Sequence, residues 1–167
     1  MTTIERTKTI QWHDPMSGAL KARQMNGLDY LQAISDGAIS YPPLLKTLDF
    51  EPVSITRGQA IFSFDPQEFH YNSIGTVHGG VISAILDTAM GCSLHSLLEA
   101  GTGYTTIELK VNFLKAITIK SGKLKAIGNI IHSGSRTALV EGTVTDEKDT
   151  IYAHGTSTCM ILTNTSK

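Results

Sequence analysis

This chain of 167 residues has little net charge, few cysteines and no long apolar run. Its formal net charge is -1, which excludes the strongly basic surface of a protein that binds nucleic acid or an anionic membrane. Its two cysteines, Cys92 and Cys159, lie far apart without metal-ligand spacing, so we expect free thiols in a reducing cytoplasm. No apolar run reaches the roughly 18 residues that a membrane-spanning helix needs.

The N-terminal residues also lack the pattern of a secretory signal, because no apolar segment follows the charges of Met1 to Arg6. A cytoplasmic protein with neither nucleic acid nor membrane as partner is therefore expected. The length suits one well-buried domain and is short for two. Residues 1–45 are predicted to form an extension with short helices, and residues 46–167 to form the main domain. Amphipathic patterns place the short helices at residues 26–34 and 42–48.

Residues 46–167 contain two kinds of hydrophobic periodicity. A helix from about residue 78 to residue 98 is apolar almost all round, so other elements must wrap it. A β-hairpin is expected over residues 53–64 before this helix. Strands that alternate with period two follow it at residues 105–113, 121–131, 137–145 and 151–161. This order predicts an α+β fold in which a curled antiparallel sheet wraps around one long central helix.

The segment that joins the loop to the helix is the most informative part of the chain. His78, Gly79 and Gly80 stand where the helix should begin, and free backbone N–H groups at a helix N-terminus can bind a developing negative charge. Asp87 lies in the apolar part of the same helix, where a buried carboxylate needs a partner or a purpose. The combination indicates acyl chemistry, in which one group polarises a carbonyl and the other handles water.

The motif Asn72-x-x-Gly75-x-x-His78-Gly79-Gly80, followed by Asp87, resembles that of the hot-dog-fold acyl-CoA thioesterases, nearest to the phenylacetate-pathway type. The resemblance covers about residues 45 to 162. It implies hydrolysis of an acyl-CoA substrate to the free acid and CoA, with no cofactor because the CoA is part of the substrate. It also implies a homodimer that is often doubled to a homotetramer.

The resemblance carries specific roles onto four residues of this sequence. The backbone N–H of Gly79 would bind the thioester oxygen, and Asp87 would act as general base or as nucleophile. Asn72 would position the thioester or the water, and Thr106 would hold the water. The residues expected to contact the substrate are His78, Gly80, Tyr71 and Arg136.

Each assignment has a structural alternative. Asp87 could be a buried acid bonded to the backbone or a serine, and a Gly-Gly pair is often a simple turn former. Asn72 could stabilise its loop and His78 could cap the helix. Thr106 falls on the polar face of its strand, opposite Leu109, where a site role and plain exposure are both compatible with the pattern.

Gly79 and Asp87 are eight positions apart on one helix, which separates their backbones by about 12 Å at 1.5 Å per residue. A thioester carbonyl must lie within about 3 Å of its oxyanion donor and close to the attacking group. We therefore expect a site shared by two antiparallel helices across a two-fold axis. Gly79 and Asn72 of one chain would then face Asp87 and Thr106 of the other.

Two other functional classes are compatible with the pattern. A non-catalytic acyl-CoA sensor would need the pocket but no acid, and a hot-dog enoyl-CoA hydratase would need a close Asp–His pair. His78 and Asp87 are about 13 Å apart by helical rise, which argues against that pair within one chain. The position of Phe69, His70 and Tyr71 before the motif hints at a pocket that tolerates aromatic acyl groups.

Overall fold

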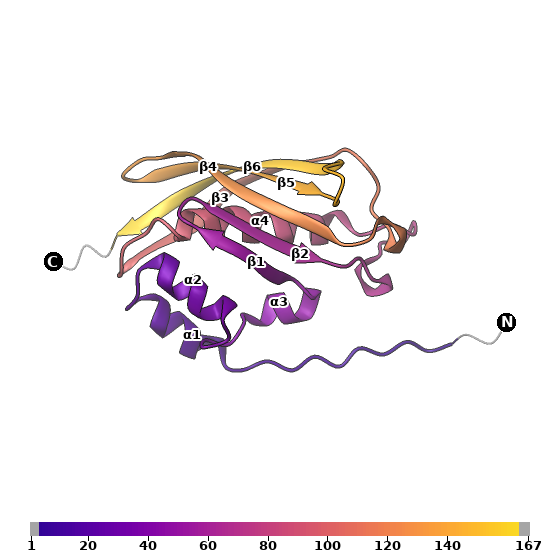
Figure 1. Cartoon of the computed structure of the whole chain (residues 1–167), viewed down its shortest axis with the longest axis horizontal. Coiled ribbons are helices and arrows are strands. Elements are labelled where there is room, and N and C mark those ends of the chain that lie inside the picture. Colours follow the sequence, from indigo (N-terminus) through magenta and orange to yellow (C-terminus); the bar gives the residue numbers. More distant parts are fainter. Residues whose placement is uncertain (1–3, 164–167) are drawn as a thin grey trace.

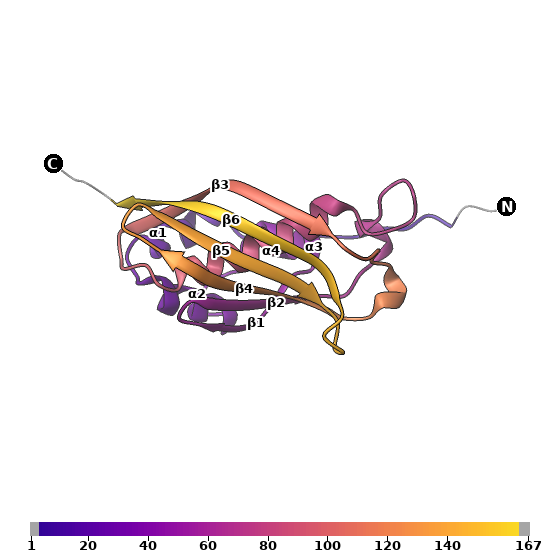
Figure 2. The same cartoon turned by 90° about the horizontal axis from the view of Figure 1, so that it is seen from above.

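The computed structural model describes residues 4–163, and its elements follow the predicted order (Figure 1). One antiparallel six-stranded sheet, in the order β1-β2-β4-β5-β6-β3, curls around the helix α4. Seen from above, the strands cross over α4 (Figure 2). The elements are α1 Pro15–Ala22, α2 Gly27–Ser35, α3 Pro43–Leu48, β1 Glu51–Thr56, β2 Gln59–Phe64, η1 Glu68–His70, α4 Gly79–His95, β3 Thr102–Phe113, η2 Ile119–Ser121, β4 Leu124–Ser133, β5 Thr137–Thr145 and β6 Ile151–Thr163. The predicted fold class is confirmed.

The central helix is buried as its composition predicts. The side chains of Ile85, Leu86 and Met90 have no exposed surface. Full burial of one such side chain stabilises a fold by about 1.5–3 kcal/mol, so this helix contributes a large part of the apolar core. Within residues 4–163, no helix has the length and apolar character to cross a bilayer.

A row of glycines lets α4 lie close against the sheet. Gly128, Gly142 and Gly155 are direct neighbours across β4, β5 and β6. A Cβ atom at Gly128 would overlap the backbone carbonyl of Ala89, which cannot rotate away as a side chain could. A Cβ atom at Gly142 would lie 3.0 Å from the side chain of Leu86. The close approach of helix and sheet therefore requires the absence of side chains in this row.

The helix α2 is fixed to the C-terminal end of α4. Asn26 caps α2, because its Oδ1 accepts a hydrogen bond from the N–H of Asp29 at 3.0 Å. The N–H of Gly27 donates to the carbonyl oxygen of Leu98 at 2.8 Å, and a Cβ atom at Gly27 would overlap the carbonyl oxygen of His95. The N-terminal helices thus pack on the main domain, on the opposite side of the molecule from β4 to β6 (Figure 1).

The helix α1 was not expected from the sequence, although a cap and a first-turn proline mark its start. Asp14 accepts a hydrogen bond from the N–H of Met16, and Pro15 occupies the first turn. None of its residues is buried. The helix α1 therefore has no side chain in the core, so core packing gives no signal for it.

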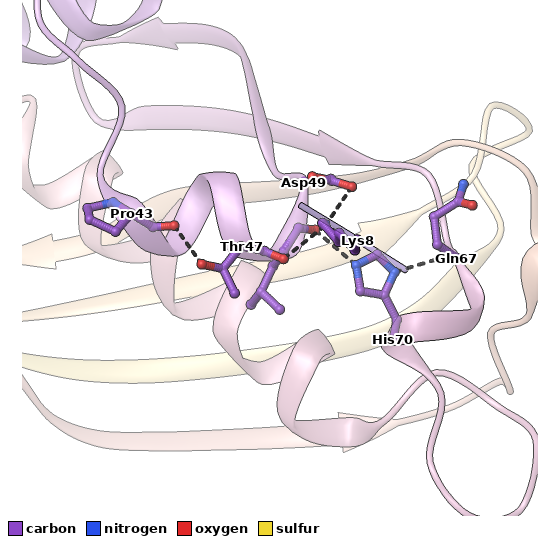
Figure 3. Close-up of polar contacts among 7 residues, drawn as sticks. Lys8, Pro43, Thr47, Asp49, Gln67 and His70 are labelled. Carbon is purple, nitrogen blue, oxygen red and sulfur yellow. Dashed lines mark hydrogen bonds and ion pairs between the residues drawn. The ribbon is translucent and has the colours of Figure 1, made fainter. Parts of the chain in front are cut away.

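A buried histidine anchors the chain that leads to α4 (Figure 3). Nδ1 of His70 accepts a hydrogen bond from the N–H of Gln67 at 3.0 Å, so the proton lies on Nε2, which donates to the carbonyl oxygen of Leu48 at 3.0 Å. Burial lowers the pKa of His70, which favours this neutral ring. Lys8 reaches the same region, where it pairs with Asp49 at 2.8 Å.

Candidate active site

Asp87 of α4 and Thr106 of β3 meet in a half-buried environment. Oγ1 of Thr106 donates a hydrogen bond to Oδ1 of Asp87 at 2.8 Å. The hydroxyl oxygen keeps its lone pairs, so it can accept a hydrogen bond from a further donor such as a water molecule. Within residues 4–163, no basic side chain forms an ion pair with Asp87. The carboxylate is thus held in place by a neutral partner and is not neutralised by a cation.

A β-bulge gives Thr106 this orientation. The register of β3 against β6 shifts between Thr106 and Glu108, and the side chain of Ile107 is 52% exposed. Beyond the bulge, Leu109 is half-buried, so Thr106 and Leu109 share the face toward α4 although they are three positions apart. The prediction that Thr106 lies on the polar face opposite Leu109 is wrong, because one inserted residue reverses the alternation.

Ser157 of β6 supports the bulge from the neighbouring strand. Its buried hydroxyl donates a hydrogen bond to the carbonyl oxygen of Glu108 at 3.0 Å. This carbonyl lies directly after the extra residue, where the regular ladder is interrupted. The bond therefore stabilises the backbone geometry that turns Thr106 toward Asp87.

A cavity of about 210 Å³ lies beside this pair. Asp87 and Thr106 form part of its wall, together with Thr88 and Cys92 of α4 and Tyr104 of β3. The remaining wall is apolar and comes from α2, α3, the loop before α3, β1 and β2. Its members are Leu31, Ile34, Pro42, Leu44, Leu45, Pro52, Ile55 and Phe62.

The other ionisable groups of this cavity are neutral at neutral pH. Burial, with a smaller contribution from the negative charge of Asp87, raises the pKa of Cys92 to about 12. Burial, followed by nearby acidic groups, raises the pKa of Tyr104 well above its ordinary value. A thiol with a raised pKa is a poor nucleophile, because the thiolate is the reactive form. Among the ionisable residues of the cavity wall, Asp87 is therefore the candidate for acid–base chemistry.

The N-terminus of α4 presents one free backbone donor. Nδ1 of His78 accepts a hydrogen bond from the N–H of Gly80 at 2.8 Å, so the ring caps the helix and occupies that donor. In the described part of the chain, no acceptor meets the N–H of Gly79. A Cβ atom at Gly79 would lie 3.1 Å from Cζ of Phe113, which places this aromatic ring beside the free donor. The helix dipole adds partial positive charge at this position.

Asn72 and Tyr71 hold the loop that precedes α4. Oδ1 of Asn72 accepts hydrogen bonds from the N–H groups of Ile74 at 3.0 Å and Thr76 at 3.2 Å. Nδ2 of Asn72 donates to Oγ1 of Thr76 at 3.0 Å. The hydroxyl of Tyr71 accepts a hydrogen bond from the N–H of Ile119 at 2.8 Å. Both side chains thus have structural roles that fix the position of the helix N-terminus.

The remaining candidate residues lie apart from the cavity. Arg136 is exposed in the turn between β4 and β5, and its carbonyl oxygen accepts a hydrogen bond from the N–H of Ile161. Phe69, His70 and Tyr71 are not among the residues that line the cavity beside Asp87. The hint of an aromatic-tolerant pocket therefore has no support at that position. Within residues 4–163, no three His, Cys, Asp or Glu side chains are placed to hold a metal ion.

Sequence reasoning missed the contribution of the N-terminal helices to this cavity. Leu31 and Ile34 of α2 are both buried and three positions apart, so they share one helix face. The amphipathic pattern of α2 shows that this face is covered, but it does not show by which element. The sequence therefore showed that α2 has a face to bury, but it did not identify the cavity that this face lines.

Comparisons with known proteins agree with the fold and the motif. The family model described as "Thioesterase superfamily" matches residues 74–153. A 1,4-dihydroxy-2-naphthoyl-CoA hydrolase from Listeria monocytogenes is 26% identical over 106 residues, which cover 64% of this chain and 85% of the relative.

Two crystal structures are similar to the present fold. A Streptococcus mutans protein bound to acetyl-CoA has a TM-score of 0.62 at 28% identity, over 68% of this chain and 89% of that one. A phenylacetic acid degradation-related protein from Ralstonia eutropha has a TM-score of 0.71 at 23% identity, over 78% of this chain and 98% of that one. The matched residues and the fold are similar to those of the thioesterase superfamily, and the chain has the hot-dog fold of thioester hydrolases.

Proposed function

We propose that this protein hydrolyses an acyl-CoA thioester to the free acid and CoA, with Asp87 as the base or nucleophile. The hydrogen bond from Thr106 to Asp87 at the wall of an apolar cavity carries the proposal. A carboxylate that is positioned by a hydroxyl and faces an apolar cavity suits attack on an acyl group bound there. CoA is part of the substrate, and the proposal requires no other cofactor.

Two chemical routes are compatible with this geometry. In the first, Asp87 removes a proton from a water held by Thr106, and the hydroxide attacks the thioester carbon. In the second, the carboxylate attacks the carbon and forms an anhydride, which water then hydrolyses. In both routes the C–S bond breaks, the sulfur of CoA leaves as a thiolate and takes up a proton, and the carbonyl oxygen carries negative charge in the transition state.

The free N–H of Gly79 is the donor that we assign to this developing charge. Gly79 begins α4 and Asp87 lies eight residues further along the same helix, about 12 Å away along its axis. The proposed site therefore joins Gly79 and Asn72 of one chain to Asp87 and Thr106 of a second copy. The edge strand β3 is twelve residues long and carries Ile107 and Phe113 with about half of their surfaces exposed, which suits such a pairing.

Release of free thiol from acyl-CoA substrates tests the assignment of Asp87. Asp87→Asn keeps the shape of the side chain, so the fold should persist while turnover falls by roughly a hundredfold or more. Asp149→Asn is the matched control, because Asp149 is exposed in a turn with φ 59°, which asparagine adopts readily. A folded Asp87→Asn variant with near-normal turnover would refute the assignment. Wild-type protein that binds acyl-CoA without hydrolysing it would indicate a sensor.

Subunit exchange tests the shared site. Gly79→Val and Asp87→Asn should each be inactive, the former because its side chain would press on Phe113 beside the oxyanion donor. In a mixed dimer one site carries both lesions and the other carries none, so up to about half of the activity should return. If exchange is demonstrated and no activity returns, each chain builds its own site.

A further inference from the structure

We propose that the N-terminal helices α2 and α3 form the end wall of the acyl-binding cavity, and that Leu31 limits the length of the acyl chain. The proposal rests on the thioesterase function above and names its substrate class. The substrate is an unsubstituted apolar acyl group of about six to eight carbons, because a cavity of about 210 Å³ has room for a group of that size. The helices that set this limit lie outside residues 74–153, which the superfamily model matches.

The cavity connects the carboxylate to the N-terminal helices. It extends from Asp87 and Thr106 to side chains of α2 and α3. An acyl chain whose carbonyl lies at Asp87 can therefore point along the cavity toward Leu31, Ile34 and Leu45. These three side chains are each 5% exposed, so the end wall is itself supported by the core.

The position of this wall is fixed by backbone contacts. Gly27 begins α2, and its N–H donates to the carbonyl oxygen of Leu98 at 2.8 Å. The close contact between Gly27 and the carbonyl oxygen of His95 leaves no room for a side chain between the two helices. Leu31 lies one helical turn after Gly27, so its distance from Asp87 is set by a rigid junction between α2 and α4.

The size of the cavity sets the length of the acyl group. A cavity of about 150 Å³ can hold benzene, and one water-sized group takes about 30 Å³. At that scale, the cavity of about 210 Å³ holds about seven carbon-sized groups. A much longer chain would have to displace the buried side chains of α2.

The chemistry of the end wall excludes polar acyl groups. The side chains of Leu31, Ile34 and Leu45 offer no hydrogen-bond partner to a hydroxyl at the far end of the substrate. A hydroxyl buried there would lose its hydrogen bonds to water without a replacement, so kcat/KM for such a substrate should be about 5- to 150-fold lower. The polar members of the wall, Thr106 among them, come from α4 and β3, the two elements that form the pair of Asp87 and Thr106.

The test measures kcat/KM for thiol release from hexanoyl-, octanoyl-, decanoyl- and dodecanoyl-CoA, and from the pair phenylacetyl- and 4-hydroxyphenylacetyl-CoA. The wild type should prefer hexanoyl- or octanoyl-CoA and should disfavour the hydroxylated member of the pair. Leu31→Ala removes three carbons from the end wall and should move the optimum to a chain about three carbons longer. The ratio of decanoyl to hexanoyl turnover should rise at least about tenfold, given about 0.8 kcal/mol for each buried methylene.

Leu20→Ala in α1 is the matched control, because Leu20 is 56% exposed and does not line the cavity. Ile34→Val removes one carbon from the same wall of α2 at a smaller cost in stability, so it decides the question if Leu31→Ala does not fold. Hydrolysis with a chain-length preference that neither wall variant shifts would overturn the inference and leave the thioesterase function intact. Absence of hydrolysis with every substrate would instead overturn the proposed function.

Discussion

Replacing Thr106 with valine isolates the hydroxyl that holds Asp87. Valine keeps the branched shape of threonine, so β3 and its bulge should persist, and only the 2.8 Å hydrogen bond to the carboxylate is lost. A hydrogen bond to a charged group contributes about 1.5–3 kcal/mol. If that energy orients Asp87 in the transition state, kcat should fall by about 10- to 150-fold, at tenfold for every 1.36 kcal/mol.

The assay is thiol release with the preferred acyl-CoA, accompanied by urea unfolding to verify that the variant is folded. Thr106→Ser restores the hydroxyl and should recover most of the lost kcat. Thr105→Val is the matched control, because Thr105 is its exposed neighbour on the same strand. The reasoning is refuted if folded Thr106→Val keeps kcat within about twofold of the wild type, far less than the loss of one such bond predicts, or if Thr106→Ser is as slow as Thr106→Val.

Three further predictions concern the elements that support the site. Ser157→Ala removes the hydrogen bond to the carbonyl oxygen of Glu108. The free energy of unfolding should fall by about 1 kcal/mol, and kcat should fall with it. A loss of stability without any loss of kcat would show that the bulge does not depend on Ser157. Gly27→Ala should destabilise the protein by about 1–3 kcal/mol in urea unfolding, whereas Gly18→Ala in α1, where a Cβ has 3.5 Å of room, should be neutral or stabilising by up to about 1 kcal/mol. Burial lowers the pKa of His70 from its ordinary 6.5, so the unfolded chain binds the proton more tightly than the folded chain does. The stability present above pH 6.5 should therefore decline as the pH falls below that value. In urea unfolding, His70→Gln should show a smaller decline between about pH 7.5 and pH 5 than the wild type.

The sequence by itself determined the architecture of the main domain. The helix α4 is apolar on nearly every side, and such a helix can be covered only if the strands wrap it. Alternation predicted β5 at its observed bounds, because the buried positions of that strand follow the period of two from Ala138 to Val144. Local chemistry also located the start of α4, since His78 and the two glycines mark a helix N-terminus.

The tertiary structure decided how the candidate site is assembled. The bulge at Ile107 depends on pairing with β6, which lies about fifty positions away, so no local pattern reports that Thr106 turns toward Asp87. The cavity wall depends in the same way on the contact between Gly27 and the end of α4. Local propensity and periodicity are properties of neighbouring residues, whereas strand register and helix docking are fixed by contacts between distant ones. For that reason the pattern of residues indicated Asp87, the family resemblance added Thr106, and only the folded chain brought them to one cavity.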